Sequence, residues 1–88
     1  MIGATTNDAM ALALRALAAT LGNQRLADRF LSVSGIEPLD LRQRAGDPAL
    51  LAALLRFLEA HEPDLVAIAE QLGAKPQDLV AARREIEQ

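Results

Sequence analysis

The chain has 88 residues and a net charge of −3, and 51% of its residues are apolar. It contains 18 alanines and 16 leucines, but only three valines and four isoleucines, and no cysteine. The lack of cysteine excludes a disulfide framework, a zinc knuckle and thiol chemistry. So few β-branched residues argue against a sheet-rich fold, and the apolar content argues against wholesale disorder. We therefore expect one small, soluble, all-α domain.

The charge and the first residues of the chain bear on its compartment. A net negative charge opposes general attraction to nucleic acid or to anionic lipid. No Lys or Arg precedes the first apolar stretch, as a secretory signal would require, and no uncharged apolar run reaches the roughly 18 residues of a membrane span. We expect a cytoplasmic protein in which residues 1–6 form a flexible N-terminus and residues 7–88 form a single helical domain.

Glycine and proline divide the chain into six predicted helices. Glycine in the left-handed conformation often ends a helix, and proline is tolerated in the first turn. Asn23 and Asp47 are the expected N-caps of the second and fourth helices, because their side chains accept a hydrogen bond from a first-turn N–H. The predicted helices span residues 7–21, 24–34, 38–45, 48–62, 63–72 and 76–87.

Helical periodicity assigns an inward face to each of the longer helices. Leu12 is the one large apolar residue of the first helix that lies off its predicted inward face. The helix at 38–45 is polar on most sides. The inward residues of the first two helices are Met10, Ala13, Leu14, Leu17 and Leu21, followed by Leu26, Phe30 and Val33.

The fourth predicted helix is apolar over an arc of about 200°, wider than the stripe of roughly 100° that a one-sided surface helix shows. It is therefore expected to be the central helix of a compact bundle. The alternative is that its extra face, together with Leu12, forms a surface for a protein partner or a second copy. The candidate interface residues are Leu12, Leu51, Leu55 and Leu58.

The segment 63–87 is similar to the DNA-binding helix-turn-helix family. Ala69 is small enough for two helices to approach, and Gly73 permits a sharp turn between them. The resemblance implies that the last helix enters the major groove. The residues that would face DNA are Lys75, Gln77, Ala81, Arg83 and Arg84.

Two considerations oppose DNA binding by this segment. Asp78, Glu85 and Glu87 leave the last helix close to neutral, although neutralisation of phosphates drives most such binding. The same spacing also serves any tight helical hairpin. We therefore expect no nucleic-acid partner and keep DNA binding as the alternative function.

Few residues suit catalysis, a metal or a cofactor, and we expect none of the three. His61 is the only histidine and has no second histidine or cysteine to share a metal, so we expect a partly buried side chain near a helix end. Ser32 and Ser34 lie in no nucleophile elbow and are expected to be helix-terminal hydroxyls.

Arg42 and Arg44 form the densest basic spot outside the last helix. Arg42 is expected to be solvated or to pair with Asp47 or Glu37, which are within its reach, and the alternative is a contact with an anion or a partner. Further along, the pattern G-x-x-P-x-D-L occurs at residues 35–41 and again at 73–79. Two explanations of this repeated pattern remain open. Both segments use glycine to end a helix and proline to start the next, or they derive from a duplicated unit.

The chain resembles a bacterial family of short all-helical proteins that is catalogued only as a domain of unknown function. The resemblance covers about residues 24–84 and implies a shared helical fold without assigned chemistry. It is carried by Phe30-Leu31, Gly35, Pro38, Leu41-Arg42, Asp47-Pro48, Leu54 through Leu58, Glu62, Leu65, Gly73, Pro76 and Ala82-Arg83.

These observations favour a non-enzymatic interaction protein that offers an apolar helical face to itself or to a partner. A helix-turn-helix DNA binder is the alternative. A small enzyme is the third hypothesis, which the missing cysteine, tyrosine and second histidine disfavour.

Overall fold

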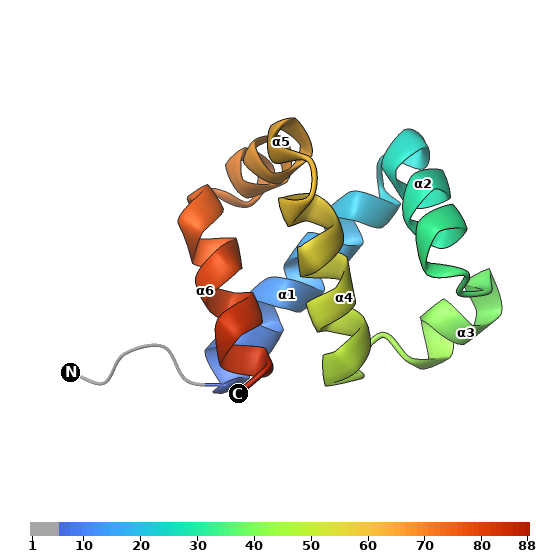
Figure 1. Cartoon of the computed structure of the whole chain (residues 1–88), viewed down its shortest axis with the longest axis horizontal. Coiled ribbons are helices and arrows are strands. Elements are labelled where there is room, and N and C mark those ends of the chain that lie inside the picture. The colour runs from blue at the N-terminus through green and yellow to red at the C-terminus, as the bar shows by residue number, and fades with distance from the viewer. Residues whose placement is uncertain (1–5) are drawn as a thin grey trace.

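Six α-helices joined by short turns make up the described part of the chain. The computed structural model describes residues 6–88, with side chains from Asp8 onward, and contains no strand in that range (Figure 1). The expected all-α fold is thus confirmed. Most of the expected flexible segment, residues 1–5, lies outside the described residues, and Thr6 begins the first helix. The helices are α1 (Thr6–Leu21), α2 (Gln24–Ser34), α3 (Pro38–Gln43), α4 (Pro48–Glu59), α5 (Glu62–Leu72) and α6 (Pro76–Ile86).

Capping residues define the ends of these helices as expected. Asn23 Oδ1 accepts a hydrogen bond from the N–H of Leu26 at 3.2 Å, and Asp47 Oδ1 accepts one from the N–H of Ala49 at 3.0 Å. Gly35 and Gly73 end α2 and α5 with φ of 73° and 71°, a left-handed conformation that other residues rarely adopt. The repeated pattern at residues 35–41 and 73–79 has such a glycine and a first-turn proline in both copies. The helices that follow differ in length, since α3 has 6 residues and α6 has 11.

The fourth helix is shorter than expected. It ends at Glu59 instead of residue 62, and Ala60 and His61 connect it to α5. Continuing the helix would press the ring of Pro63 against the carbonyl of Glu59, four residues earlier. His61 instead adopts an extended conformation with φ of −139° and precedes the first turn of α5. Similarly, α3 ends at Gln43, before the expected residue 45.

Two helices, α1 and α4, form the centre of the bundle. Each packs against the other and against α2, α5 and α6. In Figure 1, α4 and α6 lie in front of α1, while α2 and α3 extend to one side. The expected central position of the fourth helix is confirmed. Its five leucines are each at most 2% exposed, namely Leu50, Leu51, Leu54, Leu55 and Leu58, whereas Phe57 is half-buried.

The expectation that the fourth helix presents a partner surface is wrong for its three named leucines. Leu51, Leu55 and Leu58 have exposed fractions of 0%. Because α4 is packed against four other helices, its wide apolar arc is enclosed by this chain alone. Leu12 is half-buried and packs against the same core from α1.

The inward face of α1 also differs from the expected one. Ala9, Ala13 and Ala16 face the core with at most 3% of their surface exposed, whereas Leu14 and Leu21 are each 40% exposed. Small side chains allow α4 and α6 to approach α1 closely, and the helix is therefore turned with its larger leucines outward. On α2 the expected inward Val33 is likewise outward, being 72% exposed.

Within residues 6–88, no helix has both the length and the apolar character needed to cross a bilayer.

Candidate interaction surface

The outward side of α1 carries an uninterrupted apolar stripe. It consists of Ala11, Leu14, Ala18 and Leu21, all of them exposed, and we call it the α1 stripe. Successive members are three, four and three residues apart, which is the spacing of the core positions of a coiled coil. The outward side of a surface helix is normally polar. A contiguous exposed apolar patch usually marks a contact with another molecule, so the α1 stripe is a candidate interface.

The charged residue nearest the middle of α1 is held by another helix. Arg15 Nη2 donates a hydrogen bond to the carbonyl oxygen of Leu72 at 2.8 Å. This carbonyl is at the C-terminal end of α5, where a cation is favoured by the helix dipole. The contact fixes α1 against α5 and leaves the α1 stripe free of charge.

A hollow adjoins the C-terminal end of the α1 stripe. We call it the α1–α3 groove, and it has a volume of about 340 Å³. Arg42 is the single charged residue that lines it. Arg42 makes no side-chain hydrogen bond or ion pair with the described residues. The apolar residues that line the α1–α3 groove are Leu17, Leu21, Leu31, Pro38, Leu41 and Ala45.

Of the two outcomes expected for Arg42, solvation or an ion pair, the structure shows solvation, since its neighbour Arg44 pairs with Asp47. Arg44 Nη2 lies 3.0 Å from Asp47 Oδ2. Asp47 is also the N-cap of α4, and the hydrogen bond from Arg44 is the main reason that the pKa of Asp47 is lowered. Of the two arginines of this basic spot, one is thus paired at the start of α4 and the other borders the α1–α3 groove.

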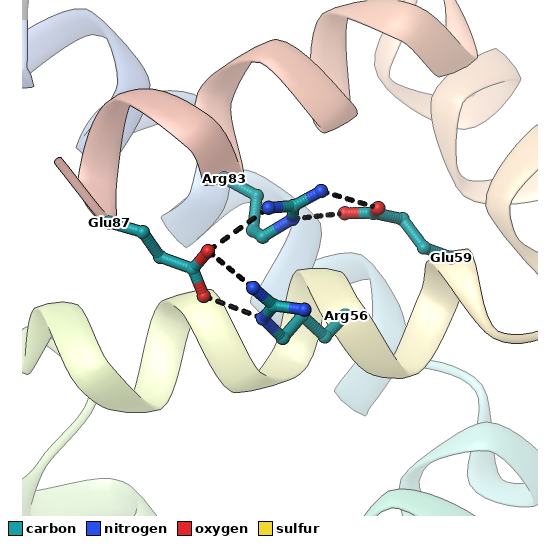
Figure 2. Close-up of polar contacts among 4 residues, drawn as sticks. All are labelled: Arg56, Glu59, Arg83 and Glu87. Atoms are coloured by element: carbon teal, nitrogen blue, oxygen red, sulfur yellow. Dashed lines mark hydrogen bonds and ion pairs between the residues drawn. The ribbon is translucent and has the colours of Figure 1, made fainter.

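Four charged side chains join α4 to α6 (Figure 2). Arg83 Nε and Nη2 donate to the two carboxylate oxygens of Glu59 at 2.8 and 3.0 Å. Its Nη1 donates to Glu87 at 3.0 Å, and Arg56 donates twice to the same carboxylate at 2.6 and 2.7 Å. These paired, planar contacts are among the stronger hydrogen bonds in proteins. We call the four residues the α4–α6 clamp.

The α4–α6 clamp corrects one expectation about the last helix. The side chain of Arg83 is only 15% exposed and occupied by two carboxylates, so it does not face solvent as a DNA contact would. Lys75, Gln77 and Arg84 are exposed. Ala81 is also exposed and lines a second hollow, of about 350 Å³, whose charged residues are Asp8, Asp78, Glu85 and Arg15. A recognition surface that lacks Arg83 and borders carboxylates is a poor match to a phosphate backbone.

A buried carboxylate joins α2 to α5. Asp64 is 5% exposed, and its Oδ2 lies 2.8 Å from Nδ1 of His61 and 3.2 Å from Nη1 of Arg29. Arg25 is more distant, at 3.5 Å from Oδ1. Burial by itself would raise the pKa of Asp64, but the hydrogen bond from His61 and the positive charges nearby outweigh it and lower the pKa.

His61 therefore has a structural position, although a different one from that expected. Its side chain is half exposed, and it lies at the start of α5 instead of within the end of the preceding helix. Ser34 matches its expected role as a helix-terminal hydroxyl, since its Oγ accepts a hydrogen bond from the N–H of Ile36 at 3.2 Å.

The paired carboxylates predict that acid destabilises the fold. The hydrogen bond from Arg56 is the main cause that lowers the pKa of Glu87 from its ordinary value of 4.5 to about 2, and the pKa of Asp64 is also lowered. A carboxyl with a lower pKa in the folded state binds fewer protons there than in the unfolded chain, so its contribution disappears as the pH falls. We expect the free energy of unfolding, measured with urea, to be constant above about pH 5 and to fall between about pH 4.5 and pH 2.

A pair of variants assigns this acid dependence to the α4–α6 clamp. Glu87→Gln should make the decline with acid shallower, because the amide does not titrate. Glu70→Gln, at an exposed position of α5 whose side chain has no ion pair among the described residues, should leave the decline unchanged. Equal declines in both variants would contradict the assignment.

The α1 stripe was missed because the first helix is apolar on nearly every side. Between residues 8 and 21, only Asp8 and Arg15 are charged. Leu14 and Leu21 were expected inside because helical periodicity groups them with Met10, Ala13 and Leu17 on one face. A usable signal was present in the regular alternation of alanine and leucine at residues 11, 14, 18 and 21.

Comparisons with known proteins identify a family but assign no activity. No curated protein and no solved structure matches the chain significantly. A family described as "Protein of unknown function (DUF3572)" matches residues 6–88. This match covers all six helices and confirms the resemblance seen in the sequence. The chain therefore belongs to this family of unknown function.

Proposed function

We propose that this protein is a non-enzymatic, self-associating module that forms a dimer through the α1 stripe. The observation that carries the proposal is that the α1 stripe, whose apolar residues have the spacing of a coiled coil, is exposed. The helix that carries it is apolar on nearly all sides. A helix of that kind is normally buried all round. In the single chain, α1 is covered on one side only, by α2, α4, α5 and α6. A second copy would cover the other side.

The order of side chains in the α1 stripe favours an antiparallel pair of α1 helices. A two-fold axis midway between Leu14 and Ala18 places each of these residues opposite the other in the partner. The same axis places Leu21 opposite Ala11. Every leucine then meets an alanine, so that large and small side chains alternate across the contact and the helices can pack closely. A parallel pair would place leucine opposite leucine.

Self-complementarity favours a second copy over an unrelated partner. In a two-fold interface the same patch must serve both sides, which the α1 stripe does without a charged residue to bury. The stripe spans ten residue steps, or roughly 15 Å along the helix axis. An interface of that length on one helix predicts a dimer that dissociates on dilution.

Light scattering and analytical ultracentrifugation test the proposal. We expect the unaltered protein to be dimeric at high concentration and Ala18→Glu to be monomeric, because the variant buries two uncompensated carboxylates at the contact. Ala67→Glu adds the same charge at an exposed position of α5 and should remain dimeric. A monomeric unaltered protein at high concentration, or equal dissociation of both variants, would overturn the proposal.

Disulfide trapping tests the antiparallel arrangement. Since the chain has no cysteine, single-cysteine variants report only the introduced pair. A mixture of Leu14→Cys and Ala18→Cys chains should form the mixed disulfide dimer faster than either chain alone. Preferential crosslinking of each variant with itself would instead indicate a parallel pair.

A further inference from the structure

The α1–α3 groove combines an apolar lining with one unpaired positive charge. Its lining side chains come from the C-terminal halves of α1 and α2 and from α3 with the residues that follow it. The groove has a volume of about 340 Å³, at the lower end of the roughly 300–1,000 Å³ that small-molecule sites occupy. Such sites are mostly apolar, with a few polar groups that orient the ligand.

The free guanidinium of Arg42 is unusual in this protein. Six of the eight arginines form an ion pair with an acidic side chain or donate a hydrogen bond to a backbone carbonyl: Arg15, Arg25, Arg29, Arg44, Arg56 and Arg83. Arg84 is the other arginine without such a contact among the described residues, and it borders none of the hollows described above. Arg42 alone joins an available charge to an apolar surface.

We infer that the α1–α3 groove binds a small amphiphile with one alkyl chain and an oxyanion head, a medium-chain carboxylate or alkyl phosphate. The alkyl chain lies along Leu17, Leu31 and Leu41, and the head accepts hydrogen bonds from Arg42. Arginine suits both heads because its planar donors match two oxygens of a carboxylate or phosphate. The complementary charge matters in a chain whose net charge of −3 otherwise repels anions.

Titration of methyl-labelled protein with octanoate, followed by NMR, tests this site below the concentration at which octanoate aggregates. We expect saturable shifts confined to the methyl groups of Leu17, Leu31, Leu41 and Ala45. Octyl phosphate should bind at the same residues, and the tighter of the two identifies the preferred head. Octylamine should bind more weakly than either, because its head repels Arg42.

Two arginine variants form the matched comparison. Arg42→Gln should weaken octanoate binding about tenfold, the effect of losing a charged hydrogen-bond donor. Arg84→Gln removes the same charge from an exposed position away from the groove and should keep the affinity within about twofold. Neither substitution removes a contact seen in the fold, and thermal melts should be unchanged.

Leu21 belongs to both the α1 stripe and the α1–α3 groove, so the titration is repeated with the monomeric Ala18→Glu variant. The same residues should shift there, because every residue that lines the groove comes from one chain. Equal binding of octylamine and octanoate, unchanged affinity of Arg42→Gln, or shifts that spread over the surface without saturating would each overturn the inference.

Discussion

Replacing Leu55 by alanine is expected to lower the free energy of unfolding by about 2–5 kcal/mol. Leu55 has no exposed surface and is part of the core cluster that α4 shares with its neighbours. The substitution removes buried apolar atoms and leaves a cavity, because a close-packed core relaxes only in part. Urea unfolding followed by circular dichroism measures the loss directly.

A leucine on the outward side of α1 provides the control for Leu55. Leu14 is 40% exposed, so Leu14→Ala should lower the free energy of unfolding by less than about 1 kcal/mol. Both variants should be measured in the Ala18→Glu protein, because dimer formation would add a concentration-dependent contribution. A larger loss for Leu14 than for Leu55 would contradict the enclosed position of α4 and restore its leucines as interface candidates.

Replacing Ala13 by leucine is expected to lower the free energy of unfolding by about 1–3 kcal/mol. Ala13 is fully buried in the core cluster, on the side of α1 that packs against the other helices. A larger side chain there must push the helices apart or adopt a strained rotamer. The prediction therefore tests whether alanine is required for the close approach of α1 to its neighbours.

Ala11 is the matched control because it lies on the opposite side of the same helix. Leucine and alanine differ little in helix propensity, so Ala11→Leu at this exposed position should change the unfolding free energy by at most about 0.5 kcal/mol in the Ala18→Glu protein. Equal losses at positions 11 and 13 would mean that the inward face of α1 is assigned wrongly.

Local chemistry explains which features of the fold could be predicted. Asn23 and Asp47 cap the first turns of their own helices, and Gly35 and Gly73 adopt the left-handed conformation at helix ends. These interactions involve residues within a few positions of each other, so the sequence predicts them directly. The wide apolar arc of α4 likewise predicted its central place, because an arc of that width requires neighbours on more than one side.

The candidate surface depended on contacts between residues distant in sequence. Arg83 pairs with Glu59, which is 24 residues away, and this pairing removes the arginine from the surface that a DNA contact would need. Arg44 and Arg42 looked equivalent as a basic pair, but only the fold shows that Arg42 borders the α1–α3 groove. No local pattern distinguishes a paired arginine from a free one.

The amino-acid sequence by itself determined the helical class, the number of helices and most of their ends, since propensity, proline and capping act over one or two turns. Only the tertiary structure decided which side of α1 is inward. An alanine- and leucine-rich helix has apolar residues on almost every side, so its own pattern does not select a face. The selection was made by packing: α1 is packed against α2, α4, α5 and α6 with Ala13 and Ala16 fully buried, and Leu14 and Leu21 are left outside.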